Sequence, residues 1–273
     1  MPIEIDLSDR VAVVTGGGGG IGRAVAVRLA AAGAFVEIAE IDSERGSDAV
    51  ATIEAAGGRA RSHDVDVVDA AQVDRLRDAV LAEHGHIDVL VNNVGHYLRP
   101  TAFLRSDADH WSALLDVNFV HLLHCTRAFA PSMVERGAGS IVNVSSVEGL
   151  RGYPPDPVYG AVKAAVVHFT RCLALELGNA GVRVNAIAPD VTQSIQVDYS
   201  GVADDLADRW PVWVPVGRVG DPLDQADVVL FLASDLSRFV TGHTIPTDGG
   251  TLAAGGWFRI PGSARWTNRP RNP

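Results

Sequence analysis

Residues 11–22 read VAVVTGGGGGIG, a run of small and β-branched residues that passes into five consecutive glycines. A short apolar run of this kind is typical of a strand buried on both faces of a sheet. Glycines let backbone amides approach a phosphate, and a helix starting after them adds positive potential at its first turn. The turn therefore predicts a dinucleotide site, with a flexible loop as the alternative, because the spacing T-G-x-x-x-G-x-G departs from the usual G-x-G-x-x-G. The residues expected to hold the cofactor here are Gly16, Gly20, Ile21 and Gly22.

The alternation of strand-like and helical segments continues to about residue 250, without a linker or an internal repeat. Expected strands cover residues 11–15, 34–39, 59–64, 87–92, 140–145, 183–187 and 243–246. Expected helices lie near 21–32, 43–56, 70–84, 107–135, 157–178 and 222–233. This pattern predicts an α/β fold, a doubly wound parallel sheet with helices on both faces. We expect one catalytic domain over residues 1–254, in which cofactor and substrate sites lie together, and a separate tail over 255–273.

Composition excludes several functional classes. The 273 residues carry 23 Lys and Arg against 33 Asp and Glu, a net charge of −10, which argues against nucleic acid or an anionic membrane as partner. No apolar run approaches the roughly 18 residues of a membrane span, and the acidic start MPIEIDLSD does not resemble a signal peptide. The two cysteines, Cys125 and Cys172, lack ligand spacing, so we expect neither a disulfide nor a metal site. These features predict a cytoplasmic protein acting on a small molecule.

Glu40 points to the choice of cofactor. It ends the second expected strand, 18 residues after Gly22. An acid there accepts hydrogen bonds from the adenosine ribose and repels a 2′-phosphate, so NAD is favoured over NADP. The alternative is that Glu40 is a solvated charge and that Arg45 helps to bind a phosphate.

A catalytic set is expected around Tyr159. Tyr159 and Lys163 stand four residues apart at the start of an expected helix, so they share one face. A nearby ammonium and a cationic nicotinamide both favour the phenolate, and Lys163 is the only lysine among 23 basic residues. Ser146 ends a strand 13 residues earlier, where its hydroxyl is expected to bind a substrate oxygen. Asn118 is expected in the middle of a helix, where an amide side chain is a mediocre choice.

Together these residues resemble the classical short-chain dehydrogenase/reductase family over residues 7 to about 250. The matching motifs are T-G-x-x-x-G-I-G at 15–22, Asp66-Val67, Asn92-Asn93-Val94-Gly95, Asn118, Ser146, Tyr159-x-x-x-Lys163, Asn185 and Pro189. The resemblance implies a single-domain Rossmann fold with a seven-stranded sheet, usually a homotetramer. It also implies reversible hydride transfer between a nicotinamide cofactor and an alcohol or ketone.

The resemblance assigns roles to individual residues. Tyr159 would be the general acid/base, Ser146 would hold the substrate oxygen, and Asn118 would position a water in a proton relay. Lys163 would bind the nicotinamide ribose and lower the pKa of the tyrosine. The remaining cofactor contacts would be Asp66 and Val67 at the adenine, Asn93 and Gly95 near the adenosine ribose, and Pro189, Val191 and Thr192 at the nicotinamide end.

Three positions depart from the family pattern. Val94 replaces the usual alanine beside the cofactor, and Asp190 replaces the glycine that usually follows Pro189. His121 stands where a small residue is common after Asn118. Since none belongs to the catalytic set, activity is expected, and the loop over 190–195 is the segment whose placement these departures put in question.

The substrate end carries less information. Loops after the carboxyl ends of the strands form the pocket in such sheets. The substrate candidates are His96, Glu148, Tyr153, Trp210 and Trp213. The alternative to a substrate contact is that His96 is a plain loop residue. For Glu148 the alternative is an acid that faces solvent. In the tail, Trp257 and Phe258 are expected to anchor against a neighbouring subunit, with disorder as the alternative.

The leading hypothesis is thus an NAD-dependent dehydrogenase of an apolar alicyclic, aryl or steroid-like secondary alcohol. The alternative is a 3-hydroxyacyl-thioester dehydrogenase or 3-oxoacyl reductase acting on acyl-CoA, since the tail arginines could meet its phosphates. Docking of an acidic carrier protein is disfavoured because the sequence shows no basic patch. A non-catalytic dinucleotide sensor is remote, because it would be expected to lack Tyr159 or Lys163.

Overall fold

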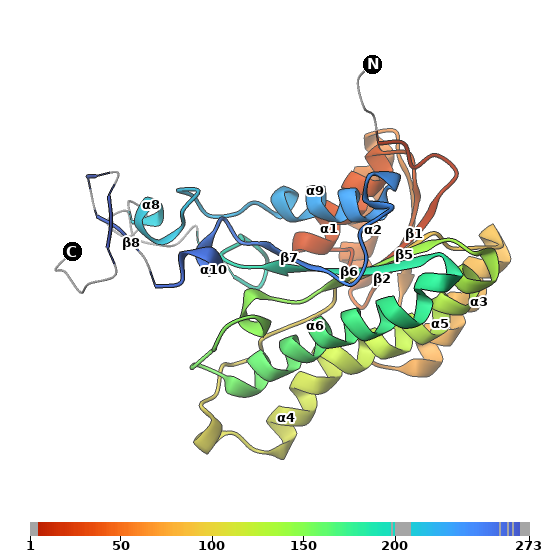
Figure 1. The fold of residues 1–273 in the computed structure, drawn as a ribbon. Helices are drawn as coiled ribbons and strands as arrows, with labels where there is room; N and C mark the ends of the chain where they lie inside the picture. Colours follow the sequence, from red (N-terminus) through yellow and green to blue (C-terminus); the bar gives the residue numbers. More distant parts are fainter. Residues whose placement is uncertain are drawn as a thin grey trace.

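The computed structural model describes residues 5–197, 199, 209–256, 258–260, 262–263 and 265–267. Within this part of the chain, seven parallel strands form one sheet in the order β3-β2-β1-β4-β5-β6-β7 (Figure 1). The strands are β1 (Val11–Thr15), β2 (Phe35–Glu40), β3 (Arg59–Asp64), β4 (Val89–Asn92), β5 (Gly139–Val144), β6 (Val182–Pro189) and β7 (Thr244–Thr247). The main helices are α1 (Gly20–Ala31), α2 (Ser43–Ala55), α3 (Ala70–His84), α4 (Ala108–Leu115), α5 (His121–Arg136), α6 (Pro157–Leu177) and α9 (Pro222–Ala233). The expected Rossmann architecture is confirmed.

Helices cover both faces of the sheet, with α1, α2 and α9 on one side and α3, α5 and α6 on the other (Figure 1). The strand β1 shows how its residues divide between two cores. Ala12 and Val14 pack with α1 and α9, while Val11 and Val13 pack with α3 and α5. Both sides are buried in the middle of the sheet, which is why the central strands β1 and β4 are nearly continuous runs of apolar residues rather than alternating ones.

Aspartates begin most of the long helices. Asp42, Asp69, Asp107, Asp156 and Asp221 each accept a backbone N–H of the first turn of α2, α3, α4, α6 and α9. Such caps satisfy amides that have no partner within the helix. The helix α1 differs, since it is preceded by Gly19, which has no side chain to cap it.

The elements agree closely with the sequence-based expectation, with one informative difference. All seven expected strands are present, with ends shifted by two residues at most. The expected helix over 107–135 is present but not uniformly α-helical. It is α4 and α5 joined by a π-helical turn, Asp116–Val120. Asn118 lies in that turn, and π-helical turns often mark functional sites.

The tail packs against its own chain. Phe258 of β8 (Phe258–Arg259) meets Trp213 of α8 (Trp210–Trp213), with 5.4 Å between ring centroids. Arg259 donates to the carbonyl of Pro215 at 3.0 Å. Trp257 lies outside the described residues, and packing on a neighbouring subunit stays a prediction.

The expectation that no segment reaches the length of a membrane span needs correction. Pro157–Ala180, which includes α6, is long and apolar enough by length and composition alone. The buried positions of α6 include Lys163 and Thr170, and the helix packs beside β6. A core helix of a soluble protein passes the same test, so this finding is weak evidence for a span.

Candidate active site

A cleft of about 550 Å³ opens at the carboxyl edge of the sheet. Parallel strands bring the loops that follow β1, β2, β4, β5 and β6 to this edge, near the point where strand order reverses. Twelve of the fourteen expected cofactor residues line the cleft: Gly16, Gly20, Ile21, Gly22, Glu40, Asn93, Gly95, Tyr159, Lys163, Pro189, Val191 and Thr192. Ser146 and the substrate candidates His96, Glu148 and Tyr153 line it too. These residues come from segments far apart in sequence.

The glycine turn forms a cradle that side chains would fill. Gly16 and Gly20 have φ values of +63° and +53°, which favour glycine. A Cβ on Gly22 would lie 2.1 Å from the carbonyl oxygen of Gly16, so no other residue fits there. The first turn of α1 holds no acid and no side-chain cap. Uncapped amides at a helix N-terminus suit an anionic group, so the cradle fits the diphosphate of a dinucleotide.

Polar side chains hold this cradle against its neighbours. Glu40 is buried, and its Oε2 accepts the N–H of Gly18 at 2.9 Å. Asn93 donates from Nδ2 to the carbonyl of Thr15 at 3.0 Å, while its backbone N–H donates to Thr15 Oγ1. The two side chains therefore shape the turn, in addition to any contact with a ribose.

Asp66 and Val67 do not line the described cleft. The carboxylate of Asp66 accepts the N–H of Val68 at 2.9 Å, and Val67 is buried in the core. The adenine contact that the family resemblance implies for them stays a prediction.

The N-terminus of α6 positions Tyr159. Asp156 is fully buried, and its Oδ1 accepts the N–H groups of Val158 and Tyr159, each at 3.1 Å. Its Oδ2 is 2.7 Å from His110 Nε2, and these hydrogen bonds lower the pKa of Asp156 although burial raises it. Sequence reasoning missed Asp156, yet the Asp-Pro pair before Tyr159 is a recognisable helix start.

Lys163 lies one turn further along α6, beneath the cleft. It is 3% exposed, its Nζ donates to the carbonyl of Val144 at 3.3 Å, and it lies 5.8 Å from the ring centroid of Tyr159. A Cβ on Gly95 would lie 2.8 Å from Nζ. Burial lowers the pKa of Lys163 to about 8, which leaves it mostly charged at neutral pH.

The pKa of Tyr159 is set mainly by its burial. Burial raises it above the ordinary value of 10, and a side-chain hydrogen bond with Ser146 acts in the opposite direction. The chain on its own therefore holds Tyr159 as a neutral phenol. The predicted lowering of this pKa by Lys163 is made for a cleft that also holds a cationic nicotinamide, and it stays a prediction.

Asn118 is buried behind the cleft. Its Nδ2 donates to the carbonyl of His96 at 2.9 Å and to that of Leu114 at 3.0 Å. Its Oδ1 accepts the N–H of His96 at 3.1 Å. The side chain therefore ties the loop after β4 to the π-helical turn, and the water-positioning role stays a prediction.

The substrate candidates separate into two groups. Tyr153 meets the ring of Tyr159 edge-on at 5.7 Å, and His96 accepts the N–H of Leu98 with Nδ1 at 2.7 Å. Trp210 and Trp213 do not line the described cleft. Trp210 packs on Tyr199 at 5.3 Å, and Tyr199 does line it.

An ion-pair network joins two acidic residues that line the cleft, Glu148 and Asp190. Arg151 contacts Glu148 at 2.8 Å and Asp190 at 3.0 Å, and Thr251 donates to the same Asp190 oxygen at 2.5 Å. Asp190 is thereby fixed, and Val191 takes a φ of +30°, which is unusual outside glycine. Sequence reasoning noted Asp190 as a departure but missed Arg151, whose partner lies 39 residues away.

Comparison with known proteins agrees with this geometry. A family model described as Enoyl-(Acyl carrier protein) reductase matches residues 16–251. A 3-oxoacyl-[acyl-carrier-protein] reductase FabG of Chlamydia muridarum is 38% identical over 246 residues, 89% of this chain and 98% of the relative. A 3-oxoacyl-[acyl-carrier-protein] reductase of Synechocystis is 38% identical over 255 residues, 90% of this chain and 98% of the relative. The chain belongs to the short-chain dehydrogenase/reductase family.

Solved structures of this family share the fold closely. Levodione reductase has a TM-score of 0.84 at 34% identity, covering 90% of this chain and 99% of the other. A 7α-hydroxysteroid dehydrogenase complexed with NADH and 7-oxo glycochenodeoxycholic acid also has a TM-score of 0.84, at 29% identity, covering 90% and 95%. The chain is an oxidoreductase of a fold that binds a nicotinamide dinucleotide.

His121 generates a prediction about stability in acid. It is 1% exposed, and burial, followed by the charge of Lys163, lowers its pKa from 6.5 to about 3. The stability gained by keeping it neutral is complete above pH 6.5 and is lost as pH falls toward 3. Between pH 7 and 4.5 we expect the wild type to lose about 2–3 kcal/mol more unfolding free energy than His121→Gln, measured by urea denaturation. Equal losses would contradict the assignment.

Proposed function

We propose that the chain is an NAD(H)-dependent reductase of 3-oxoacyl thioesters, which also catalyses the reverse oxidation of 3-hydroxyacyl thioesters. The observation that carries the chemistry is the group formed by Ser146, Tyr159 and Lys163 in one cleft with the glycine cradle. The thioester class is supported by the curated relatives, which match along about 90% of this chain.

The chain's own residues supply the acid and the orientation. Ser146 donates a hydrogen bond to the substrate carbonyl, and the neutral Tyr159 gives its proton to the same oxygen as it becomes an alkoxide. The nicotinamide, when bound, supplies the hydride that reduces the carbonyl carbon. Lys163 keeps a positive charge near the phenol and stabilises the phenolate that remains. A neutral phenol is the form that the reductive direction needs as proton donor.

Glu40 supports the choice of NAD. Its carboxylate lies at the end of β2 and lines the cleft, where a 2′-phosphate would meet like charge. Arg45 also lines the cleft, but its Nε is 3.1 Å from Asp42, which offsets its charge.

A second candidate substrate class is an apolar alicyclic, aryl or steroid-like ketone. It is favoured by the tyrosines 97, 153, 159 and 199 that line the cleft. It also agrees with the named activities of levodione reductase and the 7α-hydroxysteroid dehydrogenase.

Steady-state kinetics test the reaction and its substrate. Purified protein with NADH should reduce acetoacetyl-CoA with at least tenfold higher kcat/KM than cyclohexanone or a 7-oxosteroid, followed by absorbance at 340 nm. Tyr159→Phe should lose about 10²–10⁴-fold in kcat/KM, because the proton donor is removed. NADH affinity, followed by fluorescence, should change little. Faster reduction of the cyclic ketones would favour the second class, and an active Tyr159→Phe would refute the mechanism.

The buried position of Lys163 gives the next prediction. Lys163→Arg should lower kcat/KM more than 100-fold although charge is conserved, because a guanidinium does not fit between Gly95 and Val144. Arg75→Lys, on the exposed face of α3, is the reciprocal control and should behave as wild type. Near-full activity of Lys163→Arg would contradict a requirement for a compact ammonium.

Cofactor choice is tested at Glu40. The wild type should prefer NADH to NADPH, and Glu40→Gln should shift the ratio of kcat/KM values toward NADPH by about 10-fold or more, because like-charge repulsion is removed. Glu44→Gln removes an exposed carboxylate in the first turn of α2 that does not line the cleft, and should change the ratio less than about threefold. An unchanged ratio of kcat/KM values in Glu40→Gln would contradict a role in cofactor choice and would favour the alternative that Glu40 is a solvated charge.

A further inference from the structure

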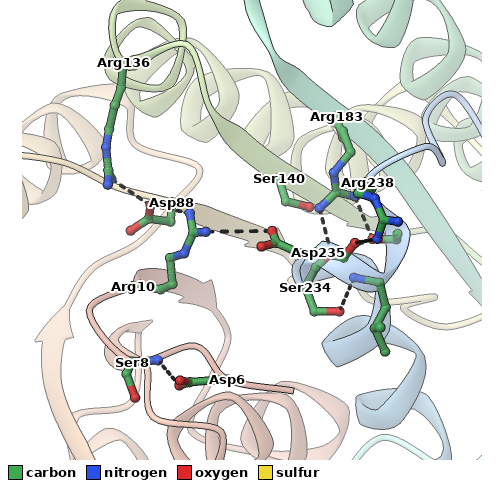
Figure 2. A network of polar contacts seen from close by, with 12 residues as sticks. Asp6, Ser8, Arg10, Asp88, Arg136, Ser140, Arg183, Ser234, Asp235 and Arg238 are labelled. Atoms are coloured by element: carbon green, nitrogen blue, oxygen red, sulfur yellow. Dashed lines mark hydrogen bonds and ion pairs between the residues drawn. The ribbon is translucent and has the colours of Figure 1, made fainter. Parts of the chain in front are cut away.

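A second cavity lies at the opposite edge of the sheet, where the strands begin. Its volume is about 490 Å³, within the range of small-molecule pockets. Small residues line it, and at one of them, Gly178, no atom lies within 4 Å of where a Cβ would be. Arg10 enters from the residue before β1, and Arg183 from the second residue of β6 (Figure 2).

Positive charge is in excess around this cavity. Three arginines and two aspartates line it, namely Arg10, Arg183 and Arg238 with Asp88 and Asp235. Arg136, which is drawn with them in Figure 2, binds Asp88 at 2.7 Å without lining the cavity. Counted as full charges, three minus two leaves a surplus of one positive charge, on a chain whose net charge is −10. This surplus is opposite in sign to the rest of the protein.

Asp88 already has several partners. Its Oδ1 accepts from Arg136 at 2.7 Å and from Arg10 at 3.2 Å, and its Oδ2 accepts the N–H of Val11 at 2.8 Å. It is 3% exposed, so two guanidinium groups share one buried carboxylate.

Arg183 is bound mainly by neutral oxygens. Its Nη1 donates to the carbonyl of Leu232 and to Ser237 Oγ, each at 2.8 Å, and its Nη2 to the carbonyl of Ser234 at 3.3 Å. Burial lowers the pKa of Arg183, the nearby Asp235 raises it, and Arg10 lowers it again. Desolvation of this cation is therefore only partly offset within the chain.

The rim of the cavity carries one cation and one anion. Arg238 is exposed and donates to the backbone carbonyl of Asp235 at 3.3 Å. The Asp235 carboxylate is 86% exposed and only 3.7 Å from Arg10 Nη2, a weak pair that an incoming anion could replace.

We propose that this cavity is a second ligand site, which binds a small molecule with at least two negative charges, such as a phosphate ester or a polycarboxylate. The guanidinium groups of Arg10, Arg183 and Arg238 match the oxygens of either class. The site is separate from the catalytic cleft, and the inference does not depend on the proposed reaction.

Isothermal titration with sodium pyrophosphate and, separately, with citrate tests this site at constant ionic strength. Saturating NADH occupies the glycine cradle during the titration. We expect binding with Kd below about 1 mM, weakened about 5- to 10-fold by Arg238→Gln through loss of one charged donor. Asp235→Asn should tighten binding several-fold, because it removes the only acid on the described rim. A purely structural role for the network would not produce that gain.

Arg45→Gln is the matched control, since Arg45 is an exposed arginine that lines the catalytic cleft instead. It should leave anion affinity unchanged. No binding of either anion up to 10 mM would overturn the proposal, as would binding that Arg45→Gln weakens and Arg238→Gln does not. Binding of pyrophosphate alone would support the site and assign it to phosphate esters, and binding of citrate alone would assign it to polycarboxylates.

Discussion

The burial of one ammonium group beneath the cleft is the constraint on which the catalytic geometry depends. A buried charge is tolerated only where neighbouring polar groups face it. Three parts of the chain approach Lys163: the end of β5, Gly95 and Gly149. Val144 accepts from its Nζ, Ser145 Oγ donates to its carbonyl, and a side chain on Gly95 or Gly149 would collide with it. The junctions after β4 and β5 are therefore shaped by Lys163, as is the register of α6.

The same packing explains why the protein alone holds Tyr159 neutral. Withdrawing the ring from water raises its pKa more than the hydrogen bond with Ser146 lowers it. A cleft that is dry enough to strengthen hydrogen bonds to a reacting carbonyl necessarily disfavours the phenolate. The acid form is thus the resting state of the chain.

Most of the fold and much of the site could be predicted from local sequence. Short runs of apolar residues identify strands that are buried on both faces, and a run of glycines before a helix identifies a phosphate-binding turn. Both signals lie within a few consecutive residues. The features that the sequence did not predict depend on contacts between residues far apart in the chain. The π-helical turn at 116–120 follows a continuous helical pattern, yet Asn118 bonds to the backbone of His96, 22 residues away. Trp213 is expected in the substrate pocket from its place in the sequence, but in the structure its ring packs against Phe258.

The distribution of basic residues follows from the same physical chemistry. Elsewhere in the chain, guanidinium groups bind carboxylates and carbonyls at several points at once, as Arg183 does with three acceptors. A guanidinium group can therefore bridge partners from different segments, as Arg151 does between Glu148 and Asp190 beside the cleft. A planar guanidinium is unsuited to the narrow space beside Gly95, where even a Cβ would lie 2.8 Å from the single nitrogen of Lys163. A sequence that uses arginine for every other cation therefore retains lysine at the one position where a compact charge is buried.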